Sequence, residues 1–180
     1  MITTRGYSVK LICYFWPILA MISVMPTLAT AAQTCRPADI AESAPAARFV
    51  INSDGTVTDS STGLIWKRCS EGLSGAKCED GAAKTYNWKE AKKAAETSKF
   101  AGRNDWRLPT IKELDTIVEF QCSMPAVNQA VFPATPALNF WSSSRYSGYS
   151  NGAWNLNFND GGRDTCSMNY SLYVRLVRGK

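Results

Sequence analysis

Alternating apolar and polar positions predict a series of short strands in the last third of the chain. Trp154, Leu156 and Phe158 alternate with Asn155 and Asn157, so one face of this strand is expected to be apolar and the other wet. The strands predicted here span residues 140–143, 153–158, 163–165 and 172–178. Closer to the N-terminus, residues 48–52 and 56–58 flank Ser53-Asp54-Gly55 and predict a hairpin, and residues 63–67 predict another strand.

Two helices are predicted between these groups of strands. Asn87 is expected to cap the first, with Glu90 at its third position. The second is expected over about residues 111–120, where Thr110 and Glu113 have the spacing of a capping box. Its apolar positions fall on one face: Ile111, Leu114, Ile117 and Val118. Strands, two helices and a second run of strands predict an α+β fold.

The segment that leads into the second helix is expected to be a structural junction. Pro109 disfavours a helical conformation at Leu108, so the chain arrives extended. Trp106 and Leu108 then point to one side, where they can be buried, while Arg107 points to the other and can reach a polar partner.

The first 31 residues have the pattern of an export signal. Arg5 and Lys10 precede an apolar run over residues 11–29, and Ala29-Thr30-Ala31 offers small residues for cleavage. An uncleaved membrane anchor is the alternative, because the apolar run is long. With cleavage, no stable membrane insertion is expected, and the protein is expected to be exported to the periplasm, to the cell surface or to the extracellular space.

The remainder is predicted to be a lead-in over residues 32–47 and one domain over residues 48–180. Loss of Arg5 and Lys10 leaves 18 of the 20 basic side chains against 15 acidic ones. This small positive excess does not indicate a nucleic-acid partner.

An odd number of cysteines remains after the signal segment. Export favours disulfides, and Cys69 and Cys78 flank a glycine-containing loop and are expected to pair. The second predicted bridge is Cys35–Cys122, with Cys122–Cys166 as the alternative. The spacing is a poor match to zinc sites, and neither a metal nor another cofactor is predicted.

The absence of histidine narrows the enzyme classes. It excludes Ser-His and Cys-His nucleophile pairs and imidazole metal ligands. Five aspartates fall mostly in turn or capping contexts: Asp54, Asp59, Asp105, Asp160 and Asp164. Glu90 and Glu113 are explained as capping partners, so no catalytic residue is predicted and the chain is expected to be non-catalytic.

Residues 142–152 have the composition of a binding loop. Tyrosines supply rigid amphipathic surface, and the surrounding serines, glycines and asparagine supply adaptable hydrogen bonds. A solvated connection between strands is the alternative. The candidate ligand-binding residues in and near this loop are Arg145, Tyr146, Tyr149, Asn151, Arg163, Asp164, Asn169 and Tyr170.

Basic residues on and after the first predicted helix form a second candidate surface, suited to anionic glycans. The five residues are Lys89, Lys92, Lys93, Lys99 and Arg103. Three of them have helical neighbour spacing and can present their charges together. An ordinary solvated helix face is the alternative. Arg107, Arg175 and Arg178 are instead expected to hold carboxylates or carbonyls within the fold.

Four segments, in order, carry a family resemblance: residues 55–66, 104–114, 140–144 and 174–179. Together they resemble the Lcl C-terminal domain family, found at the end of a bacterial collagen-like adhesin, over about residues 49–179. The resemblance implies a fold similar to C-type lectins and formylglycine-generating enzymes. It also implies sulfated glycans as a ligand class, since the best-known member binds them.

The segment from Gly161 to Ser171 is similar to the C-terminal part of formylglycine-generating enzymes. Those enzymes use two cysteines five residues apart to bind copper. Cys166 matches the first, but Ser171 stands at the second, so the pair of soft ligands is incomplete. The calcium-dependent sugar motif of C-type lectins is also absent, since Trp154-Asn155 is followed by Leu156.

The resulting hypothesis is an exported, non-catalytic, adhesin-like or lectin-like domain that recognises anionic or sulfated glycans. One alternative is a protein–protein interaction module of the cell envelope or a host surface. The other is a degenerate relative of the formylglycine-generating oxidases.

Overall fold

The computed structural model of the protein describes residues 32–179, so the signal peptide predicted over residues 1–31 lies outside the described residues. The helices are η1 (Ala46–Arg48), α1 (Trp88–Thr97), η2 (Phe100–Gly102) and α2 (Ile111–Asp115). The strands are β1 (Thr34–Cys35), β2 (Phe49–Ile51), β3 (Thr56–Asp59), β4 (Ile65–Lys67), β5 (Leu73–Ser74), β6 (Asp80–Gly81), β7 (Thr85–Tyr86), β8 (Cys122–Ser123), β9 (Asn139–Arg145), β10 (Gly152–Asn157), β11 (Gly162–Ser167), β12 (Leu172–Tyr173) and β13 (Val177–Arg178).

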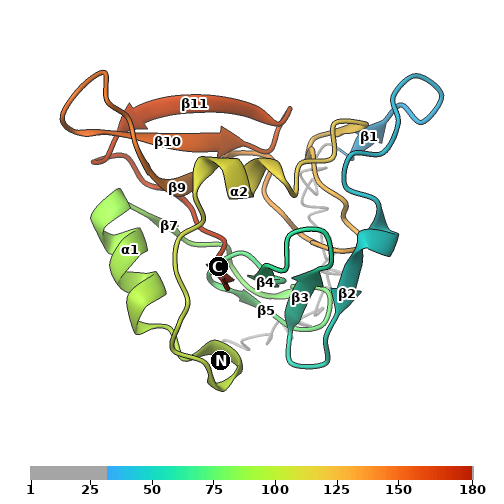
Figure 1. Cartoon of the computed structure of the whole chain (residues 1–180), viewed down its shortest axis with the longest axis horizontal. Coiled ribbons are helices and arrows are strands. Elements are labelled where there is room, and N and C mark those ends of the chain that lie inside the picture. Colours follow the sequence, from blue (N-terminus) through green and yellow to red (C-terminus); the bar gives the residue numbers. More distant parts are fainter. Residues whose placement is uncertain (1–31, 180) are drawn as a thin grey trace, which may run out of the picture. The chain divides into compact units, whose positions relative to one another are not determined.

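Two larger sheets organise this domain, as Figure 1 shows. The N-terminal hairpin belongs to a four-stranded sheet of order β13-β4-β3-β2, and the late strands form a five-stranded sheet of order β11-β10-β9-β12-β7. The pairs β1–β8 and β5–β6 form small separate ribbons. Apart from the parallel pair β12–β9, the strand pairs are antiparallel. The α+β class predicted from the sequence is confirmed. None of the helices within residues 32–179 is long and apolar enough to span a membrane.

The two α-helices, α1 and α2, begin at the capping boxes that the sequence predicts. The side chain of Asn87 accepts from the backbone N–H of Glu90, and the Glu90 carboxylate accepts from the N–H of Asn87. Thr110 and Glu113 do the same at α2. Each box satisfies two backbone donors that a helix start would otherwise leave unpaired.

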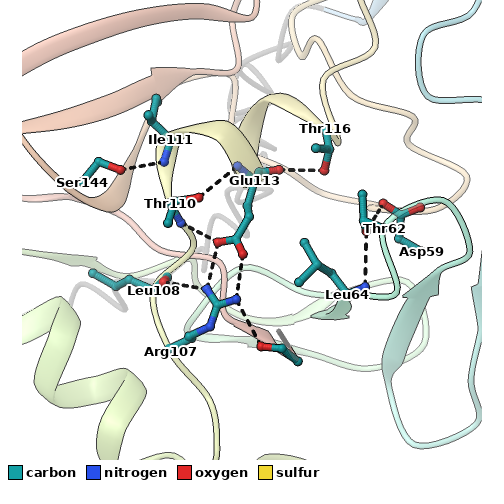
Figure 2. A network of polar contacts seen from close by, with 11 residues as sticks. Asp59, Thr62, Leu64, Arg107, Leu108, Thr110, Ile111, Glu113, Thr116 and Ser144 are labelled. Atoms are coloured by element: carbon teal, nitrogen blue, oxygen red, sulfur yellow. Dashed lines mark hydrogen bonds and ion pairs between the residues drawn. The ribbon is translucent and has the colours of Figure 1, made fainter.

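The junction before α2 is a structural element, as expected. Trp106 and Leu108 are buried, and the Arg107 guanidinium makes two hydrogen bonds of 2.8 and 2.7 Å to the Glu113 carboxylate. Figure 2 shows that Glu113 thereby binds both the helix start at Thr110 and the incoming strand at Arg107. One carboxylate fixes the angle at which the chain enters α2.

The second helix is shorter than predicted, because α2 ends at Asp115 rather than near residue 120. Beyond it, Ile117 and Val118 donate to carbonyls three residues earlier, which is a tightened turn. Val118 then forms an antiparallel bridge with Val127. The apolar positions that suggested a longer helix are buried, but turns rather than a helix place them there.

The last predicted strand, residues 172–178, is divided between the two larger sheets. Its first part, β12, pairs with β9 and β7, and its end, β13, pairs with β4. Between them the carbonyls of Val174 and Leu176 accept from the N–H groups of Glu71 and Lys67. The sequence of the segment does not show where it passes from one sheet to the other, since apolar side chains occur in both of its parts.

The expectation that the asparagine face of β10 is wet is wrong for Asn155, which is fully buried. Its side-chain oxygen accepts from the Asn139 amide at 2.6 Å, and its own amide lies 3.6 Å from the Cys166 sulfur. Leu156 packs in one apolar group and Ala153 in another, so β10 is covered on both faces. Alternation predicts only one buried face and cannot detect the second layer.

Two groups of buried apolar side chains form the core. The first lies among the four-stranded sheet, α2 and the following loops, and its largest members are Trp66, Phe132, Phe140 and Phe158. The second lies against α1, where Ala91 and Ala95 let the helix approach Trp106 and Trp141 closely. Arg175 is fully buried at the edge of the first group, with its guanidinium carbon 4.8 Å from the centre of the Phe132 ring.

Both predicted disulfides are present, and they tie different parts of the chain. Cys69–Cys78 closes a short loop of sequence separation 9, and Cys35–Cys122 joins the lead-in to β8 across 87 residues. The alternative Cys122–Cys166 pairing is therefore wrong. The lead-in is also anchored by Glu119, which accepts from the backbone N–H groups of Ser43 and Ala44.

A buried ion pair between Arg48 and Asp59 holds the N-terminal sheet together. The sequence analysis had interpreted Asp59 only as a turn residue. Asp59 is fully buried at the end of β3 and binds the Arg48 guanidinium through both carboxylate oxygens. Burial alone would raise the pKa of Asp59, but hydrogen bonds from Arg48, Thr62 and Ser61 outweigh it and lower the pKa to about 2.

This low pKa predicts how Asp59→Asn changes the response to acid. The stabilisation is fully present above the unfolded value of 3.8 and is lost as the pH falls through about 2. At pH 7 we expect the variant to be less stable by about 2.5 kcal/mol, with the difference shrinking toward pH 2. Urea unfolding from pH 7 to pH 2 measures this, with the exposed Asp39→Asn as control. A difference that stays constant over this range would contradict it.

Candidate functional site

The five predicted basic residues lie on one stretch of the structure, which we call the basic face: Lys89, Lys92, Lys93, Lys99 and Arg103. The three residues with helical spacing are on the solvent side of α1, because Ala91 and Ala95 occupy its buried side. Lys99 and Arg103 flank η2, directly after this helix. All five side chains are exposed.

The cations of the basic face differ from those that hold the fold. Within residues 32–179, ion pairs join Arg48, Lys67, Arg107, Arg163 and Arg178 to carboxylates. No member of the basic face forms one in this part of the chain. Lys92 instead places its ammonium 5.1 Å from the centre of the Trp88 ring, a cation–π contact. The charges of this face are therefore available to a ligand.

The predicted tyrosine loop forms a compact aromatic group at the tip of the β9–β10 hairpin. We call Tyr146, Tyr149 and Trp154 the tyrosine cluster. The Tyr146 ring centre lies 5.3 Å from that of Tyr149 and 5.3 Å from that of Trp154, both in edge-to-face contact. Tyr149 retains 41% of its surface exposed. Trp154 was predicted only as a core residue, and the structure adds it to this surface group.

Two glycines shape the tyrosine cluster. A Cβ atom at Gly148 would lie 2.3 Å from the Tyr146 ring, and one at Gly152 would lie 2.7 Å from the Tyr149 ring. Only glycine lets the rings lie this close to the backbone. These two glycines therefore allow the rings to pack closely over the backbone of the loop.

Polar candidates around the tip also support the loop. Arg145 donates to the Ser150 carbonyl at 3.2 Å, and the Asn151 amide donates to the Ser167 hydroxyl at 3.1 Å. Asn169 and Tyr170 lie in the turn after β11, next to this end of the hairpin, and Tyr170 is 64% exposed. Arg145 and Asn151 therefore lie at the hairpin tip with the tyrosine cluster, and Asn169 and Tyr170 lie in the neighbouring turn.

Arg163 and Asp164 do not join this group. Arg163 lies opposite Leu156 in the β10–β11 pair, four residues from Gly152 at the tip, or about 13 Å along the strand. Its guanidinium binds Asp115 of α2, with Nε 2.9 Å from a carboxylate oxygen. Asp164 accepts from the N–H of Thr165. The predicted set is therefore divided between the two ends of the strand pair.

A chain of hydrogen bonds joins the hairpin tip to the start of α1. The N–H of Met168 donates to the Asn151 carbonyl at 2.9 Å, and the N–H of Trp88 donates to the Met168 carbonyl at 3.0 Å. The Trp88 indole donates to the Ser142 carbonyl of β9 at 2.8 Å. In Figure 1 the β9–β10 loop and α1 accordingly lie on the same side of the domain.

The structure also contains a cleft that sequence reasoning missed. It has a volume of about 390 Å³ and is lined by residues 52–55, 67–69 and 73–76 and by Phe100. The hairpin turn, the end of β4 and the Cys69–Cys78 loop meet here, and no sequence motif indicates that they do. Arg68 at its wall donates to the carbonyls of Val131, Ala76 and Ala130.

Cys166 occupies a half-buried position on β11. Burial, and then the negative charge of Asp164, raise the pKa of its thiol, which disfavours the reactive thiolate. Ser171, at the position of the second cysteine in the similar oxidases, is exposed. This environment is unlike that of an activated cysteine, whose pKa is lowered.

Comparison with known proteins identifies the family of the chain. A search of curated proteins finds no match. A family model described as the Lcl C-terminal domain matches residues 55–178, which include both larger sheets almost entirely, the basic face and the tyrosine cluster. This match confirms the resemblance seen in the four sequence segments. The chain belongs to the Lcl C-terminal domain family.

Proposed function

We propose that this protein is an exported, non-catalytic domain that binds anionic glycans, sulfated ones in particular, through its basic face. The observation that carries the proposal is a group of five exposed cations gathered on and directly after α1, none of which forms an ion pair within residues 32–179. Five other cations are instead bound by carboxylates: Arg48, Lys67, Arg107, Arg163 and Arg178. Clustered free cations attract polyanions, and the attraction weakens with salt.

Several further features support the proposal. The family is named for the C-terminal domain of an adhesin that resembles this chain in sequence, and a known member binds sulfated glycans. Two disulfides are typical of proteins that fold outside the cytoplasm. The lectin-like fold is part of the same proposal and rests on the sequence resemblance. Superposition of an experimentally determined structure on C-type lectins would test it.

Replacing Lys89, Lys92 and Lys93 together by alanine is expected to weaken binding of dextran sulfate about tenfold or more at low salt. The reason is the loss of three exposed cations from one helix face, each worth up to about 1 kcal/mol. Biolayer interferometry over a range of salt concentrations measures the effect. Alanine is a strong helix former, so α1 is expected to persist.

The matched control is Lys112→Ala, which removes an exposed cation from α2. We expect this variant to bind like the unchanged protein. If the triple variant bound dextran sulfate as tightly as the unchanged protein, the basic face would not be the site.

A further inference from the structure

The hairpin tip that carries the tyrosine cluster is joined to the first turn of α1, where the basic face begins, although the two come from distant parts of the sequence. Asn151 at the hairpin tip binds Met168, and Met168 binds Trp88, the first residue of α1. Lys89 follows directly, and Lys92 lies over the Trp88 ring. A ligand held by the first turn of α1 therefore has the hairpin tip next to it.

We propose that the tyrosine cluster is the sugar-ring subsite of the glycan site, with the Tyr149 ring receiving an uncharged ring face while α1 holds the anionic groups. This inference rests on the proposed function and adds to it. The ligand would then be a sulfated polysaccharide specifically. The hairpin would not increase the affinity for polyanions that lack sugar rings.

The rings are held in place before any ligand arrives. Tyr146 donates its N–H to the Gly152 carbonyl at 2.9 Å, and Gly152 donates to the Tyr149 carbonyl at 3.2 Å, which closes the loop. The edge-to-face contacts and the close glycines then restrict the ring positions. A surface that is already ordered loses little conformational entropy on binding.

The chemistry around the rings also favours a sugar. Exposed tyrosine surface offers an apolar face with a polar edge, and the amides of Asn151 and Asn169 and neighbouring serine hydroxyls offer hydrogen bonds. A sugar ring has the complementary character, with C–H groups on its faces and hydroxyls at its rim. The adjacent lysines supply the attraction for sulfate groups.

The test compares two polyanions, dextran sulfate and inorganic polyphosphate, with Tyr149→Ala. We expect the variant to bind dextran sulfate about fivefold more weakly, as for the loss of one half-exposed aromatic contact. Its salt dependence should be unchanged, and polyphosphate binding should not change. The triple lysine variant should weaken binding of both polymers and reduce the salt dependence.

Further variants separate ring loss from loop disruption. Tyr149→Phe keeps the ring and should bind dextran sulfate nearly normally, while Tyr149→Leu keeps apolar bulk without a ring and should bind weakly. Phe120→Ala removes an exposed aromatic ring from the end of the α2 segment and serves as the matched control.

The outcomes distinguish this inference from the proposed function. If Tyr149→Ala leaves dextran sulfate binding intact while the lysine variant weakens it, the ring subsite is overturned and the basic face stands. If Tyr149→Ala weakens polyphosphate equally, the loop acts in some other way and the inference also fails. If the lysine variant has no effect on either polymer, the proposed function fails.

Discussion

Replacing Arg175 by methionine is expected to destabilise the protein by about 3–5 kcal/mol. The guanidinium is fully buried and donates to the carbonyls of Lys67 and Arg68 and to the hydroxyls of Ser70 and Thr135. Methionine fills much of the space but leaves these acceptors without a donor. Each unsatisfied buried group costs about 1–3 kcal/mol.

The charge of Arg175 itself is costly, which makes this prediction informative. Burial lowers the pKa of Arg175 to about 9, against a smaller opposing effect of the Glu71 carboxylate. Replacing a buried charge by an apolar side chain is sometimes neutral, because the cost of desolvation disappears with it. We expect the lost hydrogen bonds to outweigh this gain, because Ser70 and Thr135 stay buried and the carbonyls of Lys67 and Arg68 stay partly buried after the charge has gone.

Urea unfolding at pH 7 measures the effect, with Arg178→Ala as the matched control. Arg178 lies three residues later, and its ion pair with Asp105 is partly exposed, so its loss should cost no more than about 1 kcal/mol. An Arg175→Met protein as stable as the unchanged one would show that the acceptors find other donors or water.

Removing the Cys35–Cys122 disulfide is expected to destabilise the protein to a similar extent, by about 4.5 kcal/mol. The bridge spans 87 residues, and a cross-link of that length restricts the unfolded chain strongly. The double variant Cys35→Ser/Cys122→Ser, followed by urea unfolding under oxidising conditions, measures this loss.

The comparison is the Cys69–Cys78 disulfide, which closes a separation of 9 residues. The same chain-entropy argument gives a loss of about 2.6 kcal/mol for Cys69→Ser/Cys78→Ser, before any effect of changing two buried side chains. If removal of the long bridge left stability unchanged, the bridge would not restrict the unfolded chain as this argument requires.

Signals contained within a few residues were sufficient to predict the helix starts. Asn87 with Glu90, and Thr110 with Glu113, form capping boxes because their partners are three residues away. The partner of Arg107 was within the same short segment and was likewise predictable as a nearby polar group. Local chemistry thus positions both ends of the junction.

Features that depend on distant segments could not be predicted. The second face of β10 is buried because Trp141 and its neighbours cover Ala153. The alternation of residues within one strand does not indicate which other segments cover it. Arg163 was assigned to the ligand loop, but Asp115, 48 residues earlier, binds it instead. The sequence analysis interpreted Asp59 as an ordinary turn residue and did not predict its buried ion pair with Arg48.

The candidate site shows the same division. The charged stripe of α1 was predictable from helical spacing, because Lys89, Lys92 and Lys93 are neighbours on one helix. Its contact with the hairpin tip was not, since Met168 is about 80 residues beyond Trp88 in the sequence and joins the two by backbone atoms alone. Because only backbone atoms of Met168 take part, the type of residue at this position does not predict the contact.

The crossing of residues 174–176 between the two larger sheets has a consequence for cooperativity. Val174 and Leu176 accept hydrogen bonds from Glu71 and Lys67, while β12 just before them completes the other sheet. Because one continuous segment is bonded into both sheets, we expect the two sheets to unfold together rather than separately. A segment near the C-terminus thereby links the sheet that carries the β9–β10 hairpin to the N-terminal sheet.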